Sequence, residues 1–208
     1  MLVVKDETNK VVLQRLIDLI GSLQLKFLRK YKIPIRGGIT RGQIYLDDEI
    51  VFGAGLVEAV NLESHKAIYP RMVIDSKLYS DEHLTENLNN VKIDFDGQRY
   101  IDYFSLLTVS DIYSPKPDEK KEVCEVRNSV FDLVEKYGHY DKRETRPEKI
   151  DENTKNILKY LWIVMKYNEV VVAKGFPTQI KYDISISEKF MRFELTNLRK
   201  NPWPVIAN

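Results

Sequence analysis

The sequence has little cysteine and no long apolar run, and each absence excludes a class of protein. Its 208 residues contain a single cysteine, Cys124, so an internal disulfide is impossible and a reducing compartment is expected. No apolar run approaches the ~20 residues that span a bilayer. Residues 1–6 are too short and too soon charged for a signal peptide. We therefore expect a soluble, cytoplasmic protein without a membrane partner.

The chain also has almost no net charge. Lys and Arg number 32 against 31 Asp and Glu, and this net charge of +1 gives no general attraction to nucleic acid. A cluster of basic residues could follow a nucleic-acid backbone, but with a net charge near zero and no interleaved aromatic platform we interpret it as the solvated side of a helix and its exit. The cluster comprises Lys26, Arg29, Lys30, Lys32, Arg36 and Arg41. The histidines, His65, His83 and His139, have no metal-ligand spacing among themselves or with the cysteine, so no metal site is predicted there.

Hydrophobic periodicity predicts an α+β chain. Thr8 or Asn9 is a plausible cap for a long helix, whose apolar residues recur at three- and four-residue spacing and should face a sheet. That predicted face comprises Val12, Leu16, Leu19, Leu23, Phe27 and Leu28. Strands are predicted at residues 2–4, 33–45, 50–52, 71–75, 91–93, 100–101, 180–186 and 190–195, and helices at 53–68, 120–137 and 155–167.

The length fits one domain, or one domain with an appended subdomain. We expect a core at residues 1–110, a helical segment at 111–175 and a C-terminal extension at 176–208. Prolines among charges predict a linker at 110–121. The pair Asp96-Gly97 predicts a tight two-residue hairpin turn, because it supplies the positive φ angles that such a turn needs.

Three glycines interrupt residues 36–42, a segment that otherwise resembles a central strand, and a helix opens at Gly53. Glycine inside a strand marks a bulge or a place where a ligand or another backbone comes close. Arg36 beside these glycines is a natural clamp for phosphate or carboxylate. An arginine at a strand edge also pairs with nearby carboxylates such as Glu58 or Glu63, so both interpretations stay open. The segment predicts an anion-facing strand.

These residues belong to a longer pattern over roughly residues 1–170, whose specific part is 36–71. Its members are Arg36-Gly37-Gly38-Ile39-Thr40-x-Gly42, Tyr45, Asp47-Asp48, Phe52-Gly53-x-x-Leu56-x-Glu58-Ala59-x-x-Leu62-Glu63, Ala67, Tyr69-Pro70-Arg71, Asp96-Gly97, Tyr100, Asp102-Tyr103, Lys159-Tyr160-x-Trp162 and Tyr167-Asn168. The pattern resembles the catalytic core of the class III nucleotidyl cyclases. It is most similar to the bacterial pyrimidine cyclases of Pycsar-type anti-phage defence.

The resemblance implies a fold, a reaction and a partner. The fold is a ferredoxin-like antiparallel sheet with helices on one face, and two copies meet head to tail with the active sites at their interface. The reaction converts a nucleoside triphosphate, UTP or CTP, into cUMP or cCMP with Mn²⁺ or Mg²⁺. A homodimer is therefore expected. The nucleotide-binding residues implied are Arg36, Gly37, Gly38, Gly42, Phe52 and Gly53.

One departure from the family bears on activity. The family carries two metal-binding aspartates, one on an N-terminal strand and one in a hairpin that precedes a strand resembling residues 2–4. This chain begins at Met1 where that hairpin should end, so we expect the first strand and both aspartates to be missing. Catalytic residues are accordingly not assigned. We expect this chain alone to bind no catalytic metal and to be inactive.

Other carboxylates could form a substitute metal site. The interpretation that we favour is that they are turn and cap residues. They are Asp6 and Glu7 after the first strand, and Asp47, Asp48 and Glu49 in a later turn.

Two further positions differ from the mononucleotide cyclases. The family's transition-state asparagine and arginine align with Val57 and Asn61, and neither side chain can perform that chemistry. An apolar residue followed by Glu-Ala is typical of the Pycsar-type group, so the change favours that subfamily and leaves base preference unassigned. Two hypotheses follow. The chain is either a cyclase that works when complete, or a non-catalytic module that keeps dimerisation or nucleotide binding.

Overall fold

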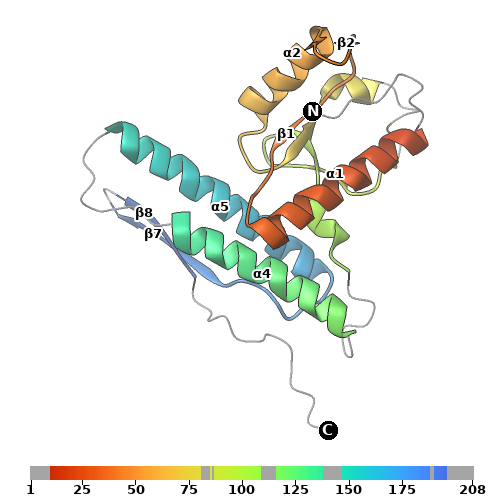
Figure 1. Ribbon diagram of the computed structural model, residues 1–208. Helices are drawn as coiled ribbons and strands as arrows, with labels where there is room; N and C mark the ends of the chain where they lie inside the picture. Colours follow the sequence, from red (N-terminus) through yellow and green to blue (C-terminus); the bar gives the residue numbers. More distant parts are fainter. Residues whose placement is uncertain are drawn as a thin grey trace. The chain divides into compact units, whose positions relative to one another are not determined.

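The structure is a computed structural model that describes residues 10–80, 85, 87–108, 116–137, 147–187 and 190–195, with the backbone alone described at 147–151, 153, 182–187 and 190–195. The strand predicted at residues 2–4 lies outside this part. The chain divides into two compact units: Met1–Leu25 with Pro34–Leu106 (unit 1), and Lys26–Ile33 with Leu107–Asn208 (unit 2). Helix α1, Lys10–Tyr31, continues from unit 1 into unit 2 (Figure 1).

Unit 1 contains a four-stranded sheet in the order β1-β4-β6-β5 and a separate hairpin formed by β2 and β3. Its elements after α1 are β1 Gly37–Ile39, β2 Tyr45–Leu46, β3 Val51–Phe52, α2 Ala54–Asn61, a π-helical turn η1 Leu62–Lys66, β4 Met72–Ile74, η2 Ser76–Ser80, β5 Val91–Ile93, β6 Arg99–Ile101 and η3 Tyr103–Leu106. The turn predicted at 47–49, the helix that follows Gly53 and the strand at 71–75 are confirmed. The predicted α+β class is also confirmed.

The sheet differs from the expected one in three respects. First, β1 runs parallel to β4, whereas β4, β6 and β5 are mutually antiparallel, so the sheet is mixed. The crossover from β1 to β4 through the hairpin and α2 makes a parallel pair possible. Second, the strand predicted at 33–45 is short and lies at one end of the sheet formed by the described residues.

Third, helical segments cover both faces of this sheet. Neighbouring residues of β4 point to opposite sides, as strand geometry requires. Ile74 lies in a cluster with Leu13 and Ile17 of α1, whereas Val73 packs with Leu62 of η1. The expectation of helices on a single face is therefore wrong, because α2 and η1 continue the crossover on the side opposite α1.

The predicted helix α1 is confirmed, but the predicted buried face is wrong in part. Leu19 and Leu23 are exposed, and Leu13 and Ile17 are buried instead. The helix carries two adjacent apolar stripes with the same spacing, so periodicity alone does not select one. Gly21 marks the buried stripe, since a Cβ there would lie 3.0 Å from Leu106 Cδ1 and 3.2 Å from Ile101 Cγ2.

The β5–β6 hairpin is confirmed, but its loop is longer than predicted. The N–H of Asp94 donates to Gln98 O at 2.9 Å, and the N–H of Gly97 donates to Asp94 O at 2.9 Å. Only Gly97 of this loop has a positive φ, 77°. Five residues, Asp94 to Gln98, therefore lie between the strands, and the buried carboxylate of Asp94 bonds to Arg71.

Unit 2 is built on two long helices, α4 Pro117–Tyr137 and α5 Pro147–Ala173, and an antiparallel hairpin of β7 Tyr182–Ser187 with β8 Phe190–Leu195 (Figure 1). Both helices and both strands were predicted. The linker prediction fails from Pro117 onward, because proline suits the first helical turn. Residues 109–115 lie outside the described part.

Residues of α5 hold the segment that follows it. Asn168 bonds both backbone groups of Ile180: its Nδ2 donates to the carbonyl at 2.7 Å, and the Ile180 N–H donates to its Oδ1 at 2.8 Å. Trp162 of the same helix is buried. Across the part of the chain that the structure describes, no helix has both the length and the apolarity that a bilayer crossing requires.

Candidate functional site

Arg36, the predicted anion clamp, lies directly before β1 and forms an ion pair inside unit 1. Its Nε lies 2.7 Å from Glu63 Oε1 of η1, and its side chain remains 42% exposed. Its Nη1 also donates to the carbonyl of Ala67, at a long 3.4 Å. Of the two interpretations that the sequence left open, the carboxylate pair is therefore present. The exposure leaves the guanidinium accessible to solvent.

The glycines predicted to face a nucleotide lie against other parts of the backbone. A Cβ at Gly38 would lie 2.5 Å from Leu62 Cβ and 2.8 Å from Ala59 O, and one at Gly42 would lie 2.7 Å from Gly55 Cα. These contacts let α2 and η1 approach β1 closely, which only glycine permits. Gly37 faces Met72, whose Sδ would lie 2.8 Å from a Cβ.

Gly53, at the start of α2, also allows two backbone segments to lie close together. Its φ of 144° lies in the region that favours glycine, and a Cβ there would lie 2.5 Å from Gln43 O. The N–H of Gly55 then donates to the same Gln43 carbonyl at 2.9 Å. The chain after β1 therefore passes directly over the first turn of α2.

Phe52 is the last of the predicted residues, and it belongs to an exposed apolar surface. Its ring stacks on Tyr45 across the β2–β3 hairpin, with centroids 4.9 Å apart. Helix α2, which follows at once, has no buried residue. We call the large apolar side chains of this region that are at least half exposed the hairpin–helix surface. Its members are Tyr45, Leu46, Ile50, Phe52, Val57 and Val60.

The carboxylate of Asp47 closes the hairpin at this surface. Its Oδ1 accepts from the N–H groups of Ile50, at 2.7 Å, and Glu49, at 3.0 Å, and its Oδ2 accepts from the Tyr45 hydroxyl at 2.9 Å. These bonds, with that of Ile50 the strongest, lower the pKa of Asp47. Asp47 is a turn residue, as we favoured.

A Mn²⁺ or Mg²⁺ site of the family's kind would need several oxygen ligands gathered at one place. Within that part no group of three or more His, Cys, Asp or Glu side chains is placed to hold a metal ion. Asp6 and Glu7 lie outside it. Asp47 uses both oxygens in the turn, so it is poorly suited to ligate Mn²⁺ or Mg²⁺.

A buried arginine brings together residues that are distant in the sequence. Arg71 is fully buried and pairs with Asp94 and Asp96 of the β5–β6 loop, and its Nη2 donates to the Lys66 carbonyl at 3.3 Å. Its guanidinium also lies 5.2 Å from the ring centroid of Tyr69. The resemblance grouped Tyr69, Arg71 and Asp96 but did not predict their contact, and it did not include Asp94. The network fixes the loop to the end of η1.

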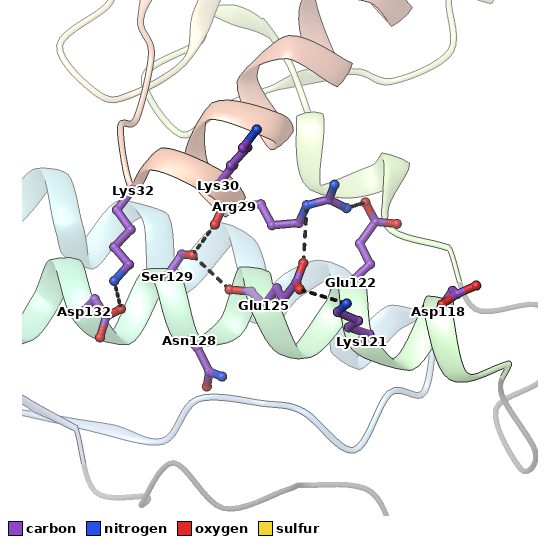
Figure 2. Close-up of a pocket in the computed structure, with 10 residues that line it drawn as sticks. All are labelled: Arg29, Lys30, Lys32, Asp118, Lys121, Glu122, Glu125, Asn128, Ser129 and Asp132. Carbon is purple, nitrogen blue, oxygen red and sulfur yellow. Dashed lines mark hydrogen bonds and ion pairs between the residues drawn. The ribbon is translucent and has the colours of Figure 1, made fainter.

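Unit 2 contains an open groove of about 780 Å³ between the end of α1 and α4. Its charged residues are largely paired: Arg29 with Glu122 and Glu125, and Lys32 with Asp132 at 2.6 Å (Figure 2). Basic and acidic side chains alternate along it, so it has no strong preference for an ion of either sign. It is lined by Arg29, Lys30, Lys32, Asp118, Lys121, Glu122, Glu125, Asn128, Ser129 and Asp132.

Side chains that line the groove connect the end of α1 to α4. The Ser129 hydroxyl contacts the carbonyls of Arg29 and Glu125, both at 2.9 Å, and Figure 2 shows these contacts beside the Arg29 ion pairs. Each exposed ion pair of this kind contributes little to the stability of the fold.

The chain was compared with protein-family models, with curated protein sequences and with solved structures, and none of the three comparisons found a match.

Proposed function

We propose that this chain is a nucleotidyl cyclase-like protein whose unit 1 acts as an association module. Two copies pair through the hairpin–helix surface, and Arg36 offers a contact for the phosphates of a nucleoside triphosphate. The observation that carries the proposal is the hairpin–helix surface itself. Six large apolar side chains, each at least half exposed, lie on one short hairpin and the helix that follows it.

Physical arguments support a second copy as the occupant of this surface. Exposed apolar side chains that gather in one region of a protein surface can mark a place where another surface binds, and two of these six, Tyr45 and Phe52, are in direct contact. A net charge of +1 puts little repulsion between two copies. A twofold axis would place the same apolar residues of both copies against each other, as closed dimers require.

Arg36 supports the nucleotide part of the proposal. Its side chain is 42% exposed. Arg71, which belongs to the same part of the pattern, is fully buried. A guanidinium can bind two phosphate oxygens at once, which makes arginine suitable for phosphate recognition. The space beside Gly37 and Gly38 is filled by Met72 and Leu62, so the glycines themselves offer no room for an anion. The proposed phosphate contact is therefore made by the exposed Arg36 guanidinium.

We propose further that formation of cUMP or cCMP, as an infection signal in anti-phage defence, needs metal-binding carboxylates additional to those of the described residues. The family's Mn²⁺ or Mg²⁺ would supply charge stabilisation for phosphoryl transfer. The alternative is a non-catalytic module. On that view association and nucleotide binding are the whole activity, and the turn role of Asp47 favours it for this chain alone.

The experiment is a turnover assay of the purified chain with UTP, CTP, ATP and GTP, each with Mn²⁺ or Mg²⁺. We expect little or no cyclic product, because the metals carry most of the transition-state stabilisation in a two-metal displacement. A matched assay uses the chain extended by an upstream segment with the two family aspartates, and product there would support the cyclase. Turnover by the original chain that is abolished by Asp47→Asn would contradict the account and require a metal site at the turn.

A further inference from the structure

We infer that Glu63 acts as an internal anion that competes with phosphate for Arg36, and so sets the affinity of this site. The inference rests on the proposed function, since it concerns regulation of the same arginine. The Glu63 Oε1 lies 2.7 Å from Arg36 Nε, an ordinary distance for a charge-assisted hydrogen bond. An incoming phosphate would need the same donor group.

The remaining contact of Arg36 is weak, which makes Glu63 its principal partner. The distance of 3.4 Å from Nη1 to the Ala67 carbonyl exceeds the usual range of 2.7–3.2 Å for such a bond. Among the described residues these are the two acceptors that the Arg36 guanidinium meets. When Glu63 is neutralised, the Nε donor and the unpaired positive charge of the guanidinium therefore become available to another anion.

The position of Glu63 suits exchange. Its side chain is 36% exposed, so water and small anions reach the pair from outside. It lies on the π-helical turn η1, and such turns occur often at functional sites. Arg71 of unit 1 differs from Arg36 in both respects. It pairs with two carboxylates, and its side chain has no exposure to solvent. An anion can compete at Arg36 and not at Arg71.

The expected gain in anion affinity can be estimated from the free energy of an exposed ion pair. Such a pair changes an equilibrium constant by a factor of about 1.5 to 5. Removing the competition from Glu63 should tighten anion binding by about the same factor. A much larger gain would require a source other than the ion pair.

The test is calorimetric titration of the full chain with inorganic tripolyphosphate at low ionic strength. Glu63→Gln should bind about 1.5- to 5-fold more tightly than the parent chain. The matched control is Glu58→Gln, which removes the same charge from a side chain of nearly equal exposure, 37%, that pairs with Lys77 at 3.5 Å. The control should gain less, because it does not release Arg36. The double variant Arg36→Gln/Glu63→Gln should lose the gain.

The outcomes separate the two proposals. If Arg36→Gln binds tripolyphosphate as well as the parent, the phosphate site itself is wrong, and the role of Glu63 fails with it. If Arg36→Gln weakens binding but Glu63→Gln is no tighter than Glu58→Gln, only the competition is wrong. Thermal unfolding checks that each variant folds. Should Glu63→Gln fail to fold, Glu63→Asp shortens the side chain, lengthens the ion pair and should tighten binding in the same direction.

Discussion

Helices α2 and α4 differ in what covers their apolar side chains. Helix α4 buries eight residues within unit 2, among them Val126, Val130 and Phe131, and it forms ion pairs with the end of α1, such as Arg29–Glu122. Helix α2 buries none of its eight residues, although Val57 and Val60 are apolar. Packing within unit 2 therefore stabilises α4. The apolar side chains of α2 are available to a partner.

Two phenylalanines provide the strongest test of this difference. Phe131 of α4 is 2% exposed, and Phe52 beside α2 is 57% exposed. Truncation of Phe131 to alanine should reduce the free energy of unfolding by about 3–5 kcal/mol, because it leaves a cavity. Phe52→Ala should change it by about 0.5 kcal/mol or less in the dissociated protein. Denaturant titration at low protein concentration measures both.

Equal losses in the free energy of unfolding from Phe131→Ala and Phe52→Ala would contradict this difference between the helices. A large loss from Phe52→Ala would mean that its ring supports the core of unit 1. A small loss from Phe131→Ala would mean that α4 contributes little to unit 2.

A smaller effect is expected at the glycine that lets η1 approach β1. In Gly38→Ala the new methyl group would lie 2.5 Å from Leu62 Cβ and 2.8 Å from Ala59 O, so η1 and the end of α2 must move. We expect a loss of about 1–3 kcal/mol in the free energy of unfolding, typical of overpacking. Because the hairpin–helix surface is displaced with α2, self-association should weaken as well.

Gly97→Ala is the matched control. Its φ of 77° is unfavourable for alanine, but no atom lies within 4 Å of a Cβ there. It should lower stability through backbone strain and leave self-association unchanged. Equal effects of the two variants on association would show that the position of α2 is irrelevant to it.

Local signals in the sequence predicted most elements but few of their contacts. Asp47 in its turn and the apolar periodicity of α5 act within a few residues, so the β2–β3 hairpin and α5 could be predicted. The choice between two apolar stripes of α1 depends on a sheet formed by residues much later in the chain. Gly21 was the available signal for that choice, since glycine in a helix can mark close packing.

The candidate site shows the same limit. The sequence identified Arg36 and the glycines as unusual, and offered either a ligand or another backbone as the reason. The contact of Gly38 with Leu62 depends on the crossover geometry, which no local pattern encodes. The meeting of Arg71 with Asp94 and Asp96 is likewise tertiary. The resemblance placed Arg71 and Asp96 in one group without giving the reason, and it did not include Asp94.

Light scattering tests most directly whether the hairpin–helix surface joins two copies of the chain. At high concentration the parent chain should scatter as a dimer, with twice the 24.4 kDa mass of one chain. Phe52→Glu/Val57→Glu should scatter as a monomer, because charges would be buried without partners. Ile93→Glu, at a residue 64% exposed on β5, should remain a dimer. A monomeric parent chain, or a dimer that Ile93→Glu disrupts as fully as the double variant, would contradict the account.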